Sequence, residues 1–269
     1  MYKAYSIVLD NKFSYRVDIE SIKKNINPTI IWEDFFDGKG NILARDLIKK
    51  WFPSKKFHIF LSHSHKDENK AIELAEYLKD NFGLKVFIDS QIWQHADELL
   101  KFFDDKFCYN DASFTYDYAM RNITTSHVHN MLSVALTKMM DQCECVFFLN
   151  TENSIAKTID ESARSQTYSS WLYLEISNLN TLQIKPTNRP PMGPGLERLD
   201  KSFTVESSHR IAPKILYDID LSFLVDLDER KMRGWISNYD ALNPYCIEKK
   251  PEEALDILYY SHAMTFRRT

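Results

Sequence analysis

One carboxylate stands inside an otherwise uncharged, largely apolar run in the second half of the chain. Residues 169–176 read SSWLYLEI, and Glu175 is the only charged residue among them. If the run continues as a helix through residue 179, Leu172, Ile176 and Leu179 share one face. Trp171 and Glu175, four residues apart, then share the adjacent face. Two interpretations stay open. Spacing alone favours an exposed helix residue. The second interpretation is that Glu175 lies beside an aromatic ring in a cleft, where burial would shift the pKa of its carboxyl group.

Polar residues also follow three short apolar runs that are typical of buried parallel strands. The runs are FHIFLSHS (57–64), KVFIDS (85–90) and CECVFFLNT (143–151). Ser62 and His63 come at the end of the first run, Asp89 at the end of the second, and Asn150 and Thr151 at the end of the third. Because ligands of open α/β proteins bind beyond the carboxyl ends of the strands, we expect these side chains to lie close together at one edge.

The histidine and cysteine spacings do not predict a metal site. His127 and His129 are two apart on a predicted helix, so they point to different faces. Cys143 and Cys145 form a C-x-C pair, but no two further ligands follow at matching spacing. We interpret these cysteines as small apolar residues at the start of a buried strand. We therefore expect neither a metal nor a resident cofactor.

The elements that would position these residues alternate between strands and helices. An amphipathic helix over 67–83 joins the first two runs into a strand–helix–strand unit, and a helix over 124–142, capped within 124–126, precedes the third run. Later segments predict a strand at 214–221, a helix at 225–239 and a last helix after Pro251. This alternation predicts an α/β fold with an open, mostly parallel sheet.

The chain divides into a main domain with an extension at each end. The predicted parts are an N-terminal extension (1–55) with helices near 17–28 and 41–53, a main domain (56–240) with a long insertion at 91–124 and a proline-rich excursion at 185–202, and a C-terminal helical tail (241–269).

Composition narrows the class of protein. The 269 residues carry a net charge of −4, which argues against nucleic acid as a partner, and the six glycines form no phosphate-binding cluster. No apolar stretch approaches the length of a membrane span, so we expect no membrane partner. The N-terminus lacks the apolar region of a secretory signal, and the four cysteines show no disulfide framework. We expect a cytoplasmic protein.

Three of these motifs, in this order, resemble those of the TIR (Toll/interleukin-1 receptor) domain family. Residues 57–67 are similar to the family's first box, 83–89 to its G-x-x-VF-x-D element, and 169–175 to its S-x-W-x-x-x-E element. The resemblance spans 57–240 and is greatest to bacterial TIR proteins of anti-phage defence, such as those of Thoeris systems.

The resemblance implies a flavodoxin-like, three-layer fold and an enzyme that cleaves the nicotinamide–ribose bond of NAD+. NAD+ would be the substrate, and the products would be nicotinamide plus ADP-ribose or a cyclic ADP-ribose-type signal. Glu175 matches the family's catalytic glutamate. The residues implied to bind the substrate are Ser62, His63, Asp89, Trp93 and Trp171.

The resemblance also implies a homo-oligomer formed through TIR–TIR contacts and a downstream effector that senses the product. One alternative is a non-enzymatic interaction module, as in TIR adaptors, where the glutamate position need not be acidic. A second alternative is a receiver or nucleotide sensor that binds without cleaving. It ranks last, because a receiver needs an acidic cluster at the strand ends and Asp89 is the only well-placed acid.

Overall fold

The computed structural model of the chain describes most of the residues. The described residues are 2–10, 13–26, 31–37, 39–52, 55–156, 165–185, 187, 189, 215–245 and 247–265. For some of them the backbone alone is described, namely 24–26, 33, 50–51, 91–95 and 262–265. In this part of the chain, no helix is both long and apolar enough to cross a membrane.

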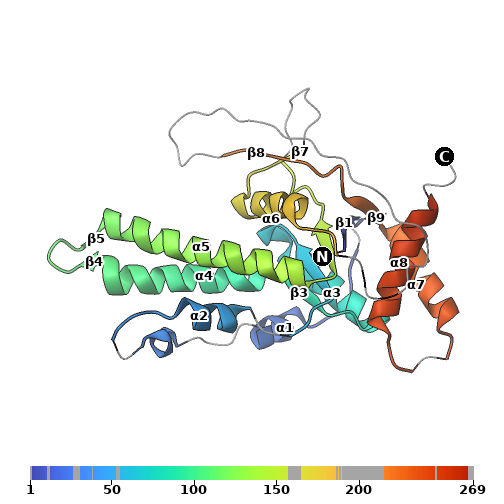
Figure 1. Cartoon of the computed structure of the whole chain (residues 1–269), viewed down its shortest axis with the longest axis horizontal. Coiled ribbons are helices and arrows are strands. Elements are labelled where there is room, and N and C mark those ends of the chain that lie inside the picture. The colour runs from blue at the N-terminus through green and yellow to red at the C-terminus, as the bar shows by residue number, and fades with distance from the viewer. Residues whose placement is uncertain are drawn as a thin grey trace.

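A five-stranded parallel sheet in the order β3-β2-β6-β1-β9 forms the centre of the molecule (Figure 1). Its strands are Lys3–Val8 (β1), Ile59–Ser62 (β2), Val86–Ile88 (β3), Cys145–Leu149 (β6) and Val225–Asp228 (β9). Two antiparallel pairs lie outside this sheet: Tyr109–Asn110 (β4) with Thr115–Tyr116 (β5), and Ser165–Thr167 (β7) with Tyr217–Ile219 (β8).

Helices cover both faces of the sheet, so the predicted α/β fold with a parallel sheet is confirmed. The α-helices are Ile19–Ile26 (α1), Ala44–Trp51 (α2), Glu68–Phe82 (α3), Ser90–Phe103 (α4), Tyr118–Gln142 (α5), Ser170–Thr181 (α6), Glu229–Leu242 (α7) and Pro251–Thr265 (α8). Three single turns are Trp32–Phe35 (η1), His65–Asp67 (η2) and the π-helical Asp104–Cys108 (η3). Helices α2, α4, α5 and α6 pack on one face, and α3, α7 and α8 on the other.

Strand β6 shows why the sequences of the predicted central strands are continuous apolar runs. Alternate side chains point to opposite faces of a sheet. Phe147 packs with the helices α3, α7 and α8, whereas Phe148 packs with α2, α4, α5 and α6, and both are fully buried. A strand covered on both faces must be apolar at every position, as the sequence predicted.

The N-terminal extension contains a strand of the central sheet. Helices α1 and α2 confirm the two predicted helices, but the expectation of a wholly helical extension is wrong for residues 3–8, which form β1 between β6 and β9. Tyr5 and Ile7 are fully buried there. Strands β3-β2-β6 follow the first part of the flavodoxin-like order 2-1-3-4-5, and the fourth place is taken by β1. Its six residues, KAYSIV, include Lys3 and Ser6, so β1 lacks the continuous apolar run from which β2, β3 and β6 were predicted.

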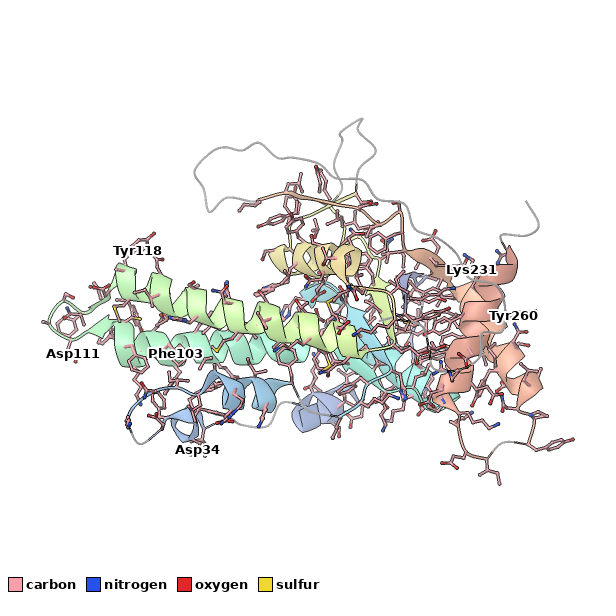
Figure 2. The ribbon with its side chains drawn as sticks, viewed as in Figure 1. Asp34, Phe103, Asp111, Tyr118, Lys231 and Tyr260 are labelled. Carbon is pink, nitrogen blue, oxygen red and sulfur yellow. The ribbon has the colours of Figure 1, made fainter. Side chains whose placement is uncertain are left out.

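The predicted insertion 91–124 builds most of a long helical arm. Helix α4 leads through η3 and the β4–β5 hairpin into α5, and Figure 2 shows Asp111 at the tip and Tyr118 close behind it. Helix α5 starts at Tyr118, so the predicted start at 124 is wrong. Asp117 caps it by accepting a hydrogen bond from the Met120 amide, 2.8 Å away. The first turns are exposed on the arm and lack the apolar stripe that marks a docked helix.

The C-terminal part also joins the body of the molecule. The predicted helix 225–239 begins later than expected, because residues 225–228 form β9 beside β1. Helix α8 confirms the predicted last helix, and Trp235 on α7 donates its indole N–H to the Ala254 carbonyl, 2.7 Å away. The predicted strand near 214–221 is β8, which pairs with β7 outside the main sheet. The excursion 185–202 lies almost wholly outside the described residues, and the domain boundaries stay a prediction.

Candidate functional site

Four of the sequence-predicted side chains meet at the carboxyl edge of the sheet. Strands β3 and β6 lie on opposite sides of β2 in the sheet. The connections that leave β2 and β3 therefore diverge, and such a point in a parallel sheet has a crevice beyond the carboxyl ends of the strands. Ser62 ends β2, His63 follows it, Asp89 follows β3, and Glu175 reaches the same place from α6. All four are buried, with exposed fractions of 0%, 4%, 1% and 0% respectively.

Helix α6 is fixed so that Glu175 points into the protein. Ser169 caps the helix, and its hydroxyl accepts a hydrogen bond from the Leu172 amide at 3.2 Å. The predicted apolar face of Leu172, Ile176 and Leu179 is buried against the sheet, which confirms that part of the helical pattern. The interpretation of Glu175 as an exposed helix residue is therefore wrong.

The buried polar groups form two linked pairs. The Ser62 hydroxyl donates to Glu175 Oε2 at 2.5 Å, and His63 Nδ1 lies 2.7 Å from Asp89 Oδ1 in an ion pair. Burial raises the pKa of Glu175 well above its usual 4.5. The charge and hydrogen bond of Asp89 raise it further, and the Ser62 hydrogen bond lowers it only in part. Folding therefore favours the protonated form of Glu175.

The charge of Asp89 is balanced by His63. Burial lowers the pKa of His63, but the charge and hydrogen bond of Asp89 outweigh that effect, so the pKa ends above its usual 6.5. The raised pKa values of His63 and Glu175 both favour a buried group that carries little net charge. Two carboxyls in contact in a buried site cannot both ionise easily, which is the physical reason for this distribution.

A cavity of about 670 Å³ opens beside the buried group, within the usual size range of small-molecule sites. His63, Asp89 and Trp171 line it, as the resemblance implied. Ser62 and Glu175 are not among its lining residues, so Glu175 lies behind the wall, where Asp89 contacts it. The side chain of Trp93 lies outside the described residues.

Three helices begin at this cavity. Glu68 at the start of α3, Ser90 at the start of α4 and the α6 cap Ser169 all line it. The free amides and dipoles of helix N-termini favour a negatively charged group. The ring of Trp171 is half-buried and meets that of His129 edge to face, with centroids 5.4 Å apart.

The sequence analysis did not identify several of the residues that line the cavity. Besides Asp89, the carboxylates Glu68, Asp97 and Glu98 line the cavity, as does His129. Asp97 and Glu98 lie about two turns into α4, and a helical reading of 90–103 would have placed them near the end of β3.

The residues after the third predicted strand bind the turn η2 instead of lining the cavity. The Thr151 hydroxyl donates to Asp67 Oδ2 at 2.5 Å, and the Asn153 amide donates to Asp67 Oδ1 at 2.8 Å. These bonds tie the loop after β6 to the turn η2, and neither residue is among those that line the cavity. Since Asp67 follows the first strand, these bonds confirm that the third strand end also lies beside the first, although it does not line the cavity.

Within the described ranges, no group of three or more His, Cys, Asp or Glu side chains is arranged to hold a metal ion. No protein-family model matches the chain, and no curated protein or solved structure matches it at a significant level.

Proposed function

We propose that this protein cleaves the nicotinamide–ribose bond of NAD+, in the manner of the TIR-domain enzymes whose motifs its sequence resembles. One observation carries the proposal: Glu175 is wholly buried at the carboxyl edge of the parallel sheet, beside the cavity. A carboxyl group in such a place lowers the stability of the fold. Its strongly raised pKa is typical of groups that take part in chemistry.

The reaction fits a single carboxylate. O-glycoside hydrolysis normally needs one carboxyl group to protonate the leaving oxygen. In NAD+ the bond between ribose C1′ and the ring nitrogen breaks with both electrons going to nitrogen, so nicotinamide leaves neutral and needs no acid. Glu175, once ionised, would stabilise the positive charge that develops on the ribose. When water adds to C1′, its proton passes to Glu175 and the product is ADP-ribose. Attack by an adenine nitrogen gives a cyclic isomer.

The cavity suits the two charges of the substrate. The pyrophosphate of NAD+ is favoured at the helix N-termini marked by Ser90 and Ser169. The cationic nicotinamide ring is favoured near Asp89, and Trp171 offers it a flat stacking surface. A cation placed beside Glu175 lowers the pKa of this carboxyl and so favours the ionised form that the reaction needs. Because Asp89 stands in the cavity wall, its side chain has to move for Glu175 to reach the ribose.

The test is incubation of the purified protein with NAD+ followed by mass spectrometry of the products. We expect nicotinamide together with ADP-ribose or a cyclic isomer. In Glu175→Gln, we expect turnover to fall by about 100-fold or more, the scale of losing one preorganised electrostatic group. Glu248→Gln is the matched control, since Glu248 is exposed on the loop before α8. Equal turnover by Glu175→Gln and the wild type would refute the assigned role.

The biological setting follows from the same resemblance. We propose a cytoplasmic protein of bacterial anti-phage defence that acts as a homo-oligomer and produces a signal for a separate effector. Light scattering with and without NAD+ tests the assembly, and a monomer under both conditions contradicts it.

A second candidate function is a non-enzymatic interaction module, and the arm favours it. The end of the arm carries exposed aromatic side chains, namely Phe107, Tyr109, Phe114, Tyr116 and Tyr118. Aromatic residues exposed together are typical of protein-binding surfaces. The position of Glu175 behind the cavity wall also fits a protein that performs no chemistry. Absence of NAD+ turnover, together with recovery of a stable partner that is lost when the arm tip is changed, would favour this candidate.

A further inference from the structure

A serine side chain is buried at the end of β2, at a position that packing alone would give to an apolar residue. Strand β2 reads IFLS, and its four residues are buried, Ser62 completely. Side chains two residues apart on a strand point to the same face of a sheet, so Ser62 lies on the face of Phe60, which the helices α2, α4, α5 and α6 cover. A buried hydroxyl group lowers the stability of a fold unless it forms a hydrogen bond. Ser62 therefore needs a polar partner on this face.

Glu175 on α6 is that partner. The Ser62 hydroxyl donates to Glu175 Oε2 at 2.5 Å, and both side chains are wholly buried. The other carboxyl oxygen, Oε1, accepts no hydrogen bond from a described donor. Asp89 contacts the carboxyl group and lines the cavity. Ser62 therefore holds one oxygen of Glu175 from the side of the sheet and leaves the other available for a further contact.

Ser62 itself is not among the described residues that line the cavity, whereas its neighbour His63 is. A molecule in the cavity would meet His63, Asp89 and Trp171 first. The substrate-binding role that the resemblance implies for Ser62 therefore has a structural alternative.

We propose that Ser62 is a positioning residue for the cleavage reaction: its hydroxyl holds Glu175 Oε2, so that Oε1 faces the ribose once Asp89 has moved aside, and Ser62 does not touch the substrate. This inference rests on the function proposed above. Strand β2 pairs with β3 on one side and with β6 on the other, so the hydroxyl is attached to an inner strand of the sheet. A carboxylate that is held in place before the substrate arrives needs no reorganisation during the reaction.

The same hydrogen bond favours the ionised form of Glu175. A hydroxyl group forms a stronger hydrogen bond with a carboxylate than with a neutral carboxyl group. The bond with Ser62 lowers the pKa of Glu175, whereas burial and Asp89 raise it. The titratable group that acts on Glu175 directly is Asp89, which is itself paired with His63. Removal of the Ser62 hydroxyl leaves both of these groups in place, so it should raise the pKa of Glu175 further.

The first experiment measures NAD+ turnover by Ser62→Ala as a function of pH. We expect kcat to fall by about tenfold, which corresponds to about 1.4 kcal/mol. KM should stay within about twofold of the wild-type value, because Ser62 contacts Glu175 and not the substrate. The acid limb of the pH profile should move to higher pH, which a loss of packing alone would not cause.

The matched control is Ser154→Ala. Ser154 is also buried, and its hydroxyl donates to the Leu149 carbonyl at 2.8 Å, but neither residue lines the cavity. Both variants lose a buried hydrogen bond, so only the acid limb and kcat separate them. Ser62→Cys keeps a weak donor of similar size, and its kcat should lie between those of Ser62→Ala and the wild type.

An infrared measurement tests the contact without turnover. The C=O band of protonated Glu175 is identified at mildly acid pH by its loss in Glu175→Gln. A hydrogen bond to the carbonyl oxygen lowers the frequency of this stretch, so the band should move to higher frequency in Ser62→Ala. A shifted band together with a wild type that does not turn over NAD+ supports the positioning of Glu175 by Ser62 and refutes the proposed reaction. An unchanged band, an unchanged kcat, an acid limb that does not move to higher pH, or a rise in KM at unchanged kcat overturns the inference.

Discussion

Replacing Glu175 by glutamine should stabilise the protein at alkaline pH and have little effect on stability at acid pH. The pKa of Glu175 is raised on folding above its usual 4.5, with burial as the largest cause. Below pH 4.5 the carboxyl is protonated in both the folded and the unfolded chain, so ionisation does not affect stability. As the pH rises, the unfolded chain gains the free energy of ionisation and the folded chain does not. The wild type therefore loses stability relative to the variant.

The size of the effect follows from the pH interval. While the folded carboxyl keeps its proton, each pH unit above 4.5 is worth about 1.4 kcal/mol, so the gain at pH 8 is at most a few kcal/mol. Glutamine has almost the same shape, and its side-chain oxygen can keep the Ser62 hydrogen bond of 2.5 Å. We therefore expect a gain on the order of a few kcal/mol at pH 8 and close to zero at pH 4.5.

Thermal unfolding at the two pH values measures this gain. A rise in Tm of about 2–4 °C for each kcal/mol is expected for a chain of this size class. Glu248→Gln, an exposed exchange of the same type, should show no pH-dependent gain. A gain that is the same at both pH values, or a variant less stable than the wild type at both, would refute the argument that the folded site keeps Glu175 protonated. A more stable but inactive variant is the pattern expected of a functional residue.

Three further predictions concern the neighbours of the site and the packing of the C-terminal helices. Asp89→Asn removes a charge that raises the pKa of Glu175, so the acid limb of the pH profile for NAD+ turnover should move to lower pH; a shift to higher pH contradicts the proposed coupling. Gly83 has φ +72°, and an added Cβ would lie 2.8 Å from the Cβ of Lys249, so Gly83→Ala should destabilise the fold by about 1–3 kcal/mol in urea unfolding. Trp235→Phe removes the indole hydrogen bond to the α8 carbonyl and should lower the stability by about 1–3 kcal/mol, whereas an unchanged urea midpoint would show that α8 docks without it.

Local sequence patterns predicted the elements that carry their own periodicity. The run 143–151 has an apolar centre, CVFFL, which forms the buried strand β6 at Cys145–Leu149. The 3.6-residue period of Leu172, Ile176 and Leu179 predicted α6 and its buried face. Strand β1 was missed because Lys3 and Ser6 interrupt its apolar pattern, and the first turns of α5 because their side chains are exposed.

The sequence likewise predicted only part of the candidate site. Their positions just after predicted strands were enough to select Ser62, His63 and Asp89 as neighbours, whereas Glu175 joined them only through the resemblance to TIR domains. The sequence could not decide whether Glu175 is exposed, because a helical period assigns residues to faces without saying what covers each face. Asp97 and Glu98 were not selected, because the residues after the second predicted strand were not recognised as a helix.

The sequence by itself therefore determined an α/β chain with polar strand ends and a motif order similar to that of TIR domains. The tertiary structure alone decided that Glu175 is wholly buried against Ser62 and Asp89, and that it stands behind the cavity wall rather than in it. The physical reason is that ionisation depends on the distance to other charges and on the exclusion of water. Both are set by segments that are far apart along the chain and meet only in the folded protein.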